Sequence, residues 1–160
     1  MSTARALPAS TIWLIIVKNR HLAKEVVMTL PQLPTEKRQH MSAAAMRTYP
    51  NIANDWGLKE QEAALLLGVP ESTYRRWRKQ PTAARLDVNQ LERMSLILGI
   101  YKALQILLPR ADAADSWLRR PNHNPLFAGQ SPLDRLRSGL VQDLYVVRQH
   151  LDTARGGGHA

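Results

Sequence analysis

The sequence has no cysteine and only one phenylalanine among its 160 residues, and aromatic residues make up 6% of it. Without cysteine the chain can form no disulfide, no thiolate zinc site and no cysteine nucleophile. Its densest apolar run near the start, residues 12–17, is far shorter than the roughly 20 residues that a membrane-spanning helix needs. We therefore expect a cytoplasmic protein with no membrane partner.

The sequence also lacks the residue patterns of catalytic and metal sites. Its histidines show no pair at metal-ligand spacing and have no acidic partners. There is no Ser-His-Asp arrangement, no phosphate-binding loop and no dinucleotide fingerprint. We expect no metal, no cofactor and no enzymatic activity, because no convergent acid–base set is present. The five histidines are His21, His40, His123, His150 and His159.

What the sequence has in excess is positive charge. Its 22 Lys and Arg residues against 13 Asp and Glu residues give a formal net charge of +9. This balance favours polyanionic partners, bound with an affinity that falls steeply with salt. Charge alone would also allow RNA or a membrane surface, but we expect DNA and no membrane partner, and no aromatic-rich strand points to an RNA-stacking sheet.

Residues 60–77 have the pattern of a helix, a sharp turn centred on Gly68, and a second helix. This is typical of a helix-turn-helix, whose second helix lies in the DNA major groove. Gly68 suits a turn with positive φ, and Ala64 is small where the two helices cross closely. The residues expected to face inward are Val69, Tyr74 and Trp77.

The second helix, expected at residues 71–79, carries the strongest charge bias. Between residues 71 and 85 five basic residues stand against one acidic residue. Arginine can bind guanine bidentately, and hydroxyl groups can reach phosphates or base edges. The alternative is an ordinary helical hairpin with a solvated basic face. The candidate DNA-contacting residues are Glu71, Ser72, Thr73, Arg75, Arg76 and Lys79.

The rest of the chain predicts an all-α fold, because no convincing alternating strand appears after residue 30. Residues 1–34 are expected to be a weakly structured leader. Thr35 is predicted to cap the next helix, and Pro50 to kink that helix or to divide it into two shorter pieces. The predicted buried face of this region consists of Ala45, Tyr49, Ile52, Ala53 and Trp56.

Residues 89–108 form the longest hydrophobic helix, which Pro109 ends. The helix is apolar nearly all round, which predicts either a central helix or a dimer face. A single DNA-reading helix contacts too few base pairs for tight specific binding, so we expect a homodimer on paired half-sites. The candidate dimer surfaces are this helix and the leader.

After Pro109 we expect a helix at about residues 112–119 and a loop at 121–129. Ser131 is predicted to cap a short helix that has Pro132 at its first position and ends near Gly139. A last helix is expected from Leu140, followed by a Gly-rich tail that cannot hold a helix. The predicted buried face of this last helix consists of Leu140, Val141, Leu144, Val147 and Leu151.

The C-terminal half carries several motifs in a fixed order. They are Trp-Leu-Arg-Arg-Pro-Asn at 117–122, Pro-Leu-Phe-Ala-Gly-Gln-Ser-Pro-Leu-Asp at 125–134, Gly139, and Asp-Leu-Tyr-Val-Val-Arg at 143–148. Together they resemble the toxin-binding domain of the Xre/MbcA/ParS antitoxins, and residues 92–104 resemble that family's central helix. The resemblance covers about residues 40–158.

This resemblance implies a type II antitoxin whose partners are operator DNA and a RES-domain toxin. Such toxins degrade NAD or use it for ADP-ribosylation. The antitoxin's last helix and tail cover the toxin's NAD pocket, and the complex represses its own operon. The implied division is a leader at 1–34, a DNA-binding domain at 35–108 and a toxin-binding domain at 109–160. The implied toxin-facing residues are Trp117, Arg119, Asn122, Phe127, Arg148, Arg155, Gly156, Gly157 and Gly158.

Several of these residues also have a simpler structural interpretation. Trp117 and Phe127 are typical of core packing or loop anchoring, and Asn122 between prolines is typical of a turn. A tail at residues 155–158 is typical of a frayed end, although a slim Gly-rich terminus can also enter a pyrophosphate pocket. Arg148 can pair with acidic groups on a toxin. The alternative functions are a free-standing helix-turn-helix regulator and a DNA-bound adaptor without a toxin.

Overall fold

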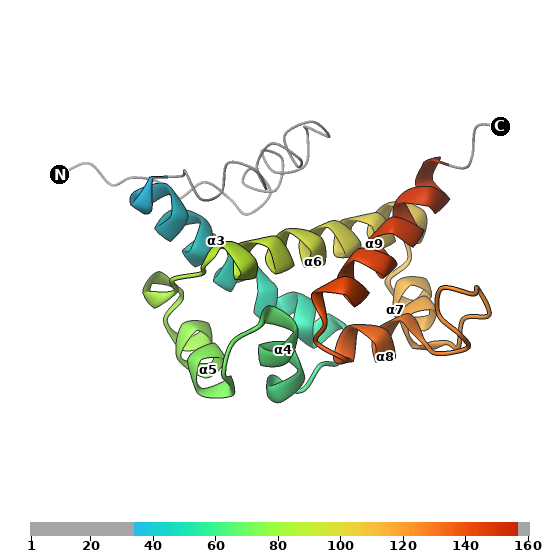
Figure 1. Cartoon of the computed structure of the whole chain (residues 1–160), viewed down its shortest axis with the longest axis horizontal. Coiled ribbons are helices and arrows are strands. Elements are labelled where there is room, and N and C mark those ends of the chain that lie inside the picture. The colour runs from blue at the N-terminus through green and yellow to red at the C-terminus, as the bar shows by residue number, and fades with distance from the viewer. Residues whose placement is uncertain (1–33, 157–160) are drawn as a thin grey trace.

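All regular secondary structure in the part of the chain that the structure describes, residues 34–156 of a computed structural model, is helical (Figure 1). Within those residues there is no strand, and the predicted all-α fold is confirmed. The predicted leader, apart from Pro34, and the tail residues Gly157 and Gly158 lie outside the described residues. The elements are α3 (Thr35–Asp55), α4 (Glu60–Leu67), α5 (Glu71–Lys79), η2 (Pro81–Ala83), α6 (Val88–Leu107), α7 (Ala111–Arg119), α8 (Pro132–Arg137) and α9 (Val141–Gly156).

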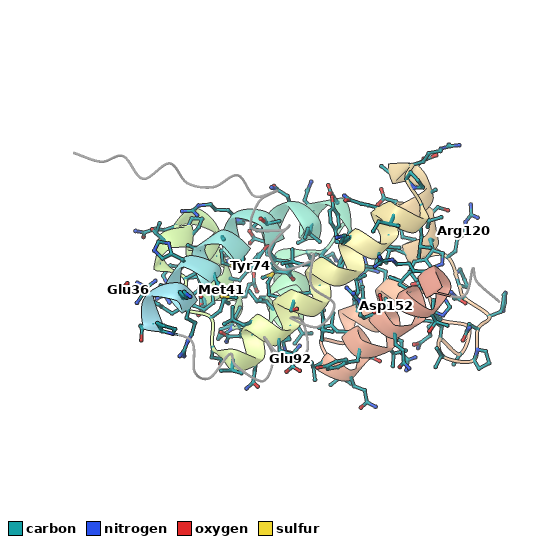
Figure 2. All side chains as sticks on the ribbon, turned by 90° about the horizontal axis from the view of Figure 1, so that it is seen from above. Glu36, Met41, Tyr74, Glu92, Arg120 and Asp152 are labelled. Carbon is teal, nitrogen blue, oxygen red and sulfur yellow. The ribbon has the colours of Figure 1, made fainter. Side chains whose placement is uncertain are left out.

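Helix α6 is the centre of the fold. Asp87 begins it with a capping box, in which its carboxylate accepts a hydrogen bond of 2.8 Å from the Gln90 amide and its own amide donates to Gln90 Oε1. Helices α3, α4, α7 and α9 all pack against α6, and Figure 2 shows α6 and α9 side by side. Only Asn89, Gln105 and Ile106 of this helix are exposed. The central-helix interpretation is therefore confirmed, and α6 has no continuous free face.

Helix α3 differs from the prediction at two positions. Thr35 is its first residue rather than its cap, because the extended backbone of Pro34 holds the N-cap position without a side-chain hydrogen bond. Pro50 lies inside one continuous helix, so the division into two shorter pieces is wrong. A proline removes one backbone donor, but most helix stability in proteins comes from packing of the apolar face. That face is buried as predicted, at Ala45, Tyr49, Ile52, Ala53 and Trp56.

The C-terminal helices follow the local signals closely. Ser131 Oγ accepts a hydrogen bond of 3.1 Å from the Asp134 amide, and Pro132 is the first helical residue of α8, as predicted. Leu140 precedes α9 and is exposed, so its predicted burial is wrong. Helix α9 continues through Arg155 to Gly156, one turn beyond the buried Leu151, which holds the end of the helix on the core. Between α5 and α6 the chain forms the short 3₁₀ helix η2.

A polar junction joins the helix-turn-helix region to the C-terminal helices. Arg93 of α6 donates from Nη1 to the carbonyl of Leu66 at 3.2 Å and to that of Gly139 at 2.7 Å. The Nε atom of Arg137 in α8 lies 3.1 Å from Oε1 of Glu62 in α4. One arginine side chain, that of Arg93, thus binds a carbonyl in the last turn of α4 and a carbonyl in the turn after α8. In Figure 1, α5 lies at one end of the molecule and α7 with its following loop at the other.

Candidate functional site

The turn between α4 and α5 has the geometry of a helix-turn-helix. Gly68 has φ +80, a left-handed conformation that favours glycine, and it ends α4. The amides of Gly68 and Val69 both donate to the Ala64 carbonyl, at 2.9 and 3.0 Å. Ala64 itself is buried where the helices meet. The predictions for Gly68 and Ala64 are confirmed.

Two tyrosines and a tryptophan fix α5 against the core. Tyr74 and Trp77 are buried, as is Val69 before them. The Tyr74 ring meets that of Tyr49 in α3 edge to face, with 5.9 Å between ring centres. The Tyr49 hydroxyl donates to the Ala63 carbonyl at 2.7 Å, and burial raises the pKa of Tyr49 well above its ordinary value. This packing directs the opposite face of α5 outward.

That outward face carries the residues predicted to contact DNA. Ser72, Arg75, Arg76 and Lys79 are exposed, and Glu71 and Thr73 are half-buried. Within the described residues, the side chains of Arg76 and Lys79 form no hydrogen bond or ion pair. They therefore offer free cationic groups to a polyanion.

Glu60, which sequence reasoning missed, holds two arginines of this face. Its Oε2 accepts from Arg75 Nε at 2.7 Å, and its Oε1 pairs with Arg78. Arg75 also pairs with Glu71 one turn earlier in α5. The hydrogen bond from Arg75 lowers the pKa of Glu60 below its ordinary value, and the charge of Arg78 adds to this. The position of the Arg75 guanidinium is thus fixed by carboxylates on both helices of the motif.

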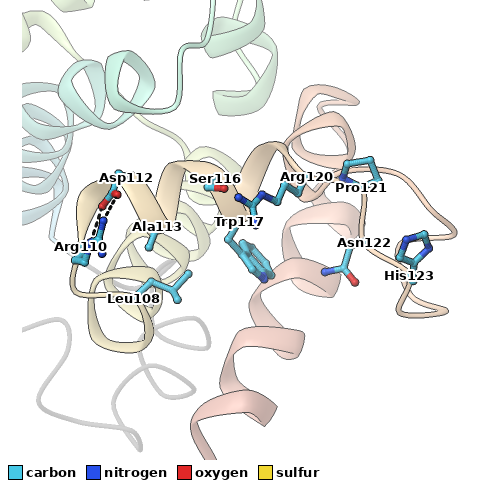
Figure 3. Close-up of a pocket in the computed structure, with 10 residues that line it drawn as sticks. All are labelled: Leu108, Arg110, Asp112, Ala113, Ser116, Trp117, Arg120, Pro121, Asn122 and His123. Carbon is cyan, nitrogen blue, oxygen red and sulfur yellow. Dashed lines mark hydrogen bonds and ion pairs between the residues drawn. The ribbon is translucent and has the colours of Figure 1, made fainter.

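A second candidate site lies at the far end of the molecule, along α7. It is a concave site of about 680 Å³ between α7 and residues 120–123 (Figure 3). It brings together Trp117 and Asn122, both predicted to face a toxin, and adds Arg110 and Arg120. The lining residues are Leu108, Arg110, Asp112, Ala113, Ser116, Trp117, Arg120, Pro121, Asn122 and His123.

The two arginines of this concave site differ in their partners. Arg110 is engaged by Asp112, with Nη2 at 2.5 Å from Oδ2, as the dashed lines in Figure 3 mark. The exposed guanidinium of Arg120 has no hydrogen bond or ion pair with any residue between 34 and 156. The site thus presents one free positive charge beside the Trp117 indole and the Asn122 amide.

Aromatic packing holds one wall of this site in place. Trp117 stacks on His150 of α9 with 5.9 Å between ring centres and an interplanar angle of 17°. Phe127 meets both rings edge to face and is fully buried. Phe127 is therefore a core residue that anchors its loop, and the prediction that it faces a toxin directly is corrected on this ground. His150 was not singled out, because its role depends on how α7 and α9 pack.

Asn122 has the turn role that its position between prolines indicates. Its Oδ1 accepts from the Asn124 amide at 2.9 Å. The Asn122 amide donates to the Gln130 carbonyl, and its carbonyl accepts from the Gly129 amide, both at 3.1 Å. These bonds close the loop, and the Asn122 side chain lines the concave site (Figure 3).

Positive charge also gathers where α9 crosses α6. Arg148 donates from Nε to Asp152 Oδ2 at 2.8 Å, and Arg155 lies 3.9 Å from the same carboxylate. The pKa of Lys102 in α6 is lowered by burial and then by the charges of Arg155 and Arg148. Arg148 and Arg155, both predicted toxin-facing residues, thus share the Asp152 carboxylate near the end of α9, and Lys102 lies close enough to feel their charges.

The remaining predicted toxin-facing residues lie elsewhere. The Arg119 guanidinium packs on Gly57 in the turn after α3, where an added Cβ would lie 2.9 Å from Nη2. Gly156 is exposed with open space around it. Arg119 therefore connects α7 to the helix-turn-helix region, rather than joining the other candidates.

Two further properties concern the described residues alone. No group of three or more His, Asp or Glu side chains there could hold a metal ion. No helix between residues 34 and 156 combines the length and apolar character required to cross a membrane.

Comparison with known proteins agrees with this geometry. Residues 37–99 match the antitoxin Xre-like helix-turn-helix domain, and residues 103–157 match the antitoxin Xre/MbcA/ParS C-terminal toxin-binding domain. The chain is 43% identical over 115 residues to the uncharacterized protein y4oB of Sinorhizobium fredii (strain NBRC 101917 / NGR234), an alignment covering 71% of this chain and 86% of that protein. The first match contains α5 and the second contains the concave site. The chain therefore belongs to the Xre/MbcA/ParS family of antitoxins, with a DNA-binding domain followed by a toxin-binding domain.

Proposed function

We propose that this antitoxin binds and inhibits a RES-domain toxin that consumes NAD or ADP-ribosylates a target. It acts by covering the toxin's active site, in the cytoplasm and without enzymatic activity of its own. The observation that carries the proposal is the pair of cationic surfaces on the toxin-binding domain. One is Arg120 in the concave site, and the other is the group Lys102, Arg148 and Arg155 beside the tail. Cationic groups of this kind suit acidic side chains around a toxin's active site.

Within this proposal the toxin-binding residues have distinct roles. Trp117, Asn122 and Arg120 form a concave surface that receives a projecting part of the toxin. Arg148 and Arg155 pair with acidic side chains at the rim of the toxin's cleft. The Gly-rich segment from Gly156 through Gly157 and Gly158 enters that cleft, since glycine brings no side chain that would clash. Division of the chain near residue 108 separates these roles from DNA binding.

The DNA-binding domain is proposed to repress the antitoxin's own operon. Helix α5 enters the major groove, with Arg75 and Arg76 at base edges and Lys79 and Ser72 at phosphates. One helix reads too few base pairs for tight binding, so two copies of the chain act as a homodimer on paired half-sites. The exposed basic face of α5 supports this part of the proposal.

Co-expression with the protein encoded by the neighbouring gene, which we expect to be RES-like, tests the toxin partner. We expect the neighbour to arrest growth alone and growth to return when this chain is also expressed. A chain lacking residues 157–160 keeps all of α9 and is expected to lose neutralisation. The matched control carries Arg76→Ala and Lys79→Ala, which alter α5 alone and are expected to neutralise normally. A neighbour that is harmless alone, or lethal beside the intact chain, contradicts the proposal and favours a free-standing regulator.

A further inference from the structure

Exposed apolar side chains gather at one place on the surface. Five large hydrophobic side chains are exposed in the described part of the chain, and three of them surround the turn before α9. Leu65 of α4 is 50% exposed and Leu140 is 62% exposed. Gly139, with φ +72, lies against Leu65 so closely that an added Cβ would be 2.4 Å from Leu65 Cγ. Leu65 and Leu140 therefore flank the same glycine.

Tyr145 of α9 extends this surface. It is 44% exposed, and its hydroxyl donates a hydrogen bond to Glu92 of α6. The next residue, Arg93, binds the Gly139 carbonyl at 2.7 Å. Four elements thus meet around Gly139, and we call the surface formed by Leu65, Gly139, Leu140 and Tyr145 the Gly139 patch. A cluster of exposed apolar side chains on a monomer is typical of an interaction site.

The charges around the Gly139 patch differ from those of the chain as a whole. The chain has 22 basic residues against 13 acidic ones, but the rim of the patch carries four acidic and three basic side chains. Most of them are paired with one another. The rim residues are Glu62, Glu92, Asp134, Asp143, Arg93, Arg135 and Arg137. A polyanion gains little here, whereas a surface that presents both signs can face a copy of itself without net repulsion.

We propose that the Gly139 patch is the contact through which two copies of this chain form the homodimer, an inference that rests on the DNA-binding role proposed above. A twofold contact uses the same patch on both subunits, so Leu65 and Leu140 of each copy pack against the other copy's patch. Leu65 belongs to the first helix of the helix-turn-helix. Dimerisation there therefore sets the separation of the two α5 helices, which half-site spacing on DNA requires.

The test is the mass of the full chain in solution, measured by light scattering across a concentration series without DNA or toxin. Leu65→Asp combined with Leu140→Asp is expected to weaken dimerisation by roughly 30-fold or more, as for central apolar contacts. Leu140→Asp alone, at an exposed position outside any helix, is expected to act in the same direction and keeps the test valid should the double variant fold poorly. Leu126→Asp is the matched control, because Leu126 is 46% exposed in a different loop.

Each other result overturns the inference in a recognisable way. A wild-type dimer that survives Leu140→Asp and the folded double variant places the dimer contact elsewhere. Equal weakening by Leu126→Asp shows a general effect of charge. A wild-type chain that stays monomeric, with a Leu140→Asp variant that no longer binds toxin, assigns the patch to the toxin. Toxin neutralisation is scored separately by co-expression, so failure of the dimer contact is distinguished from failure of the antitoxin role.

Discussion

The guanidinium of Arg148 in α9 lies on the backbone of Gly99 in α6, so closely that a Cβ atom at position 99 would be 1.5 Å from Nη1. Gly99 is buried inside a helix, where glycine costs roughly 0.5–1 kcal/mol relative to alanine. The absence of a side chain at position 99 leaves room on α6 for the Arg148 guanidinium, which pairs with Asp152 one turn along its own helix. Gly99 therefore fixes where Arg148 presents its charge.

Gly99→Ala is predicted to separate stability from toxin binding. The atom in conflict is the end of a flexible side chain, so Arg148 moves away at the cost of an ion pair worth about 0.5 kcal/mol. The higher helix propensity of alanine stabilises α6 by a similar or larger amount, which offsets the lost ion pair. We expect the free energy of unfolding in urea to change by less than about 1 kcal/mol. Affinity for the toxin should fall about as far as in Arg148→Ala, measured by calorimetry. Normal toxin affinity in Gly99→Ala contradicts a role for the position of Arg148.

Glu60→Gln is predicted to strengthen non-specific DNA binding. The substitution frees Arg75 and Arg78 from the carboxylate that pairs with both, and it removes one negative charge from the DNA-facing side. Glu60 competes with DNA phosphates for these arginines, so its neutralisation should allow about one additional phosphate contact. The DNA affinity should then fall more steeply with salt. Fluorescence anisotropy with a random duplex at several salt concentrations measures both effects. Glu71→Gln, which releases Arg75 alone, is the matched control and is expected to give a smaller change. Identical salt slopes for wild type and Glu60→Gln are incompatible with this role.

Arg75→Ala and Arg76→Ala are each predicted to weaken operator binding by roughly 1–3 kcal/mol if the side chain contacts a base. Arg85→Ala is a suitable control, because Arg85 is exposed and basic but bonds to the carbonyls of Thr82 and Ala84 outside α5. Gel shifts with the operator and with a scrambled duplex separate base contacts from phosphate contacts. Unchanged operator affinity in both α5 variants shows that the helix-turn-helix serves as scaffold alone.

Arg93→Ala is predicted to destabilise the whole chain. Arg93 Nη1 donates to two backbone carbonyls that otherwise lack a helical partner, those of Leu66 and Gly139. Leaving partly buried carbonyls unsatisfied costs about 1–3 kcal/mol each. The midpoint of urea unfolding measures the destabilisation. We expect Arg93→Ala to lower this midpoint more than Arg110→Ala does. Arg110 pairs with Asp112 on an exposed surface, where such pairs contribute about 0–1 kcal/mol. Equal midpoints for the two variants exclude a structural junction at Arg93.

The sequence predicted those parts of the fold that local rules decide. Gly68 ends α4 with positive φ, and Ser131 caps α8, because each conformation depends on residues within one helical turn. The division of α3 at Pro50 and the burial of Leu140 were predicted incorrectly, because the environment of both residues depends on distant segments. Packing of α3 on the core keeps the helix continuous through Pro50, and the junction around Gly139 leaves Leu140 outside the core.

The candidate sites were predictable only in part, for a similar reason. The outward residues of α5 follow from helix periodicity once Tyr74 and Trp77 are assigned to the core. The pairing of Glu60 with Arg75, across 15 positions, follows instead from the angle at which α4 and α5 cross. His150 in turn joins the aromatic cluster only because α9 packs beside α7. The angle and position at which two helices pack cannot be predicted from the periodicity of a single sequence.

Arg120→Ala is predicted to weaken toxin binding more than Arg110→Ala, although both side chains line the same concave site. Arg110 is already paired with Asp112, so a toxin carboxylate must compete for it, whereas the Arg120 guanidinium has no described partner to give up. A free arginine at an interface that gains a charge-assisted hydrogen bond contributes roughly 1.5–3 kcal/mol, which corresponds to about 10- to 140-fold in affinity. Calorimetric titration of the toxin with each variant measures the difference. Because both positions are exposed, folding should be unaffected, and equal loss in the two variants would rule out a specific role for Arg120.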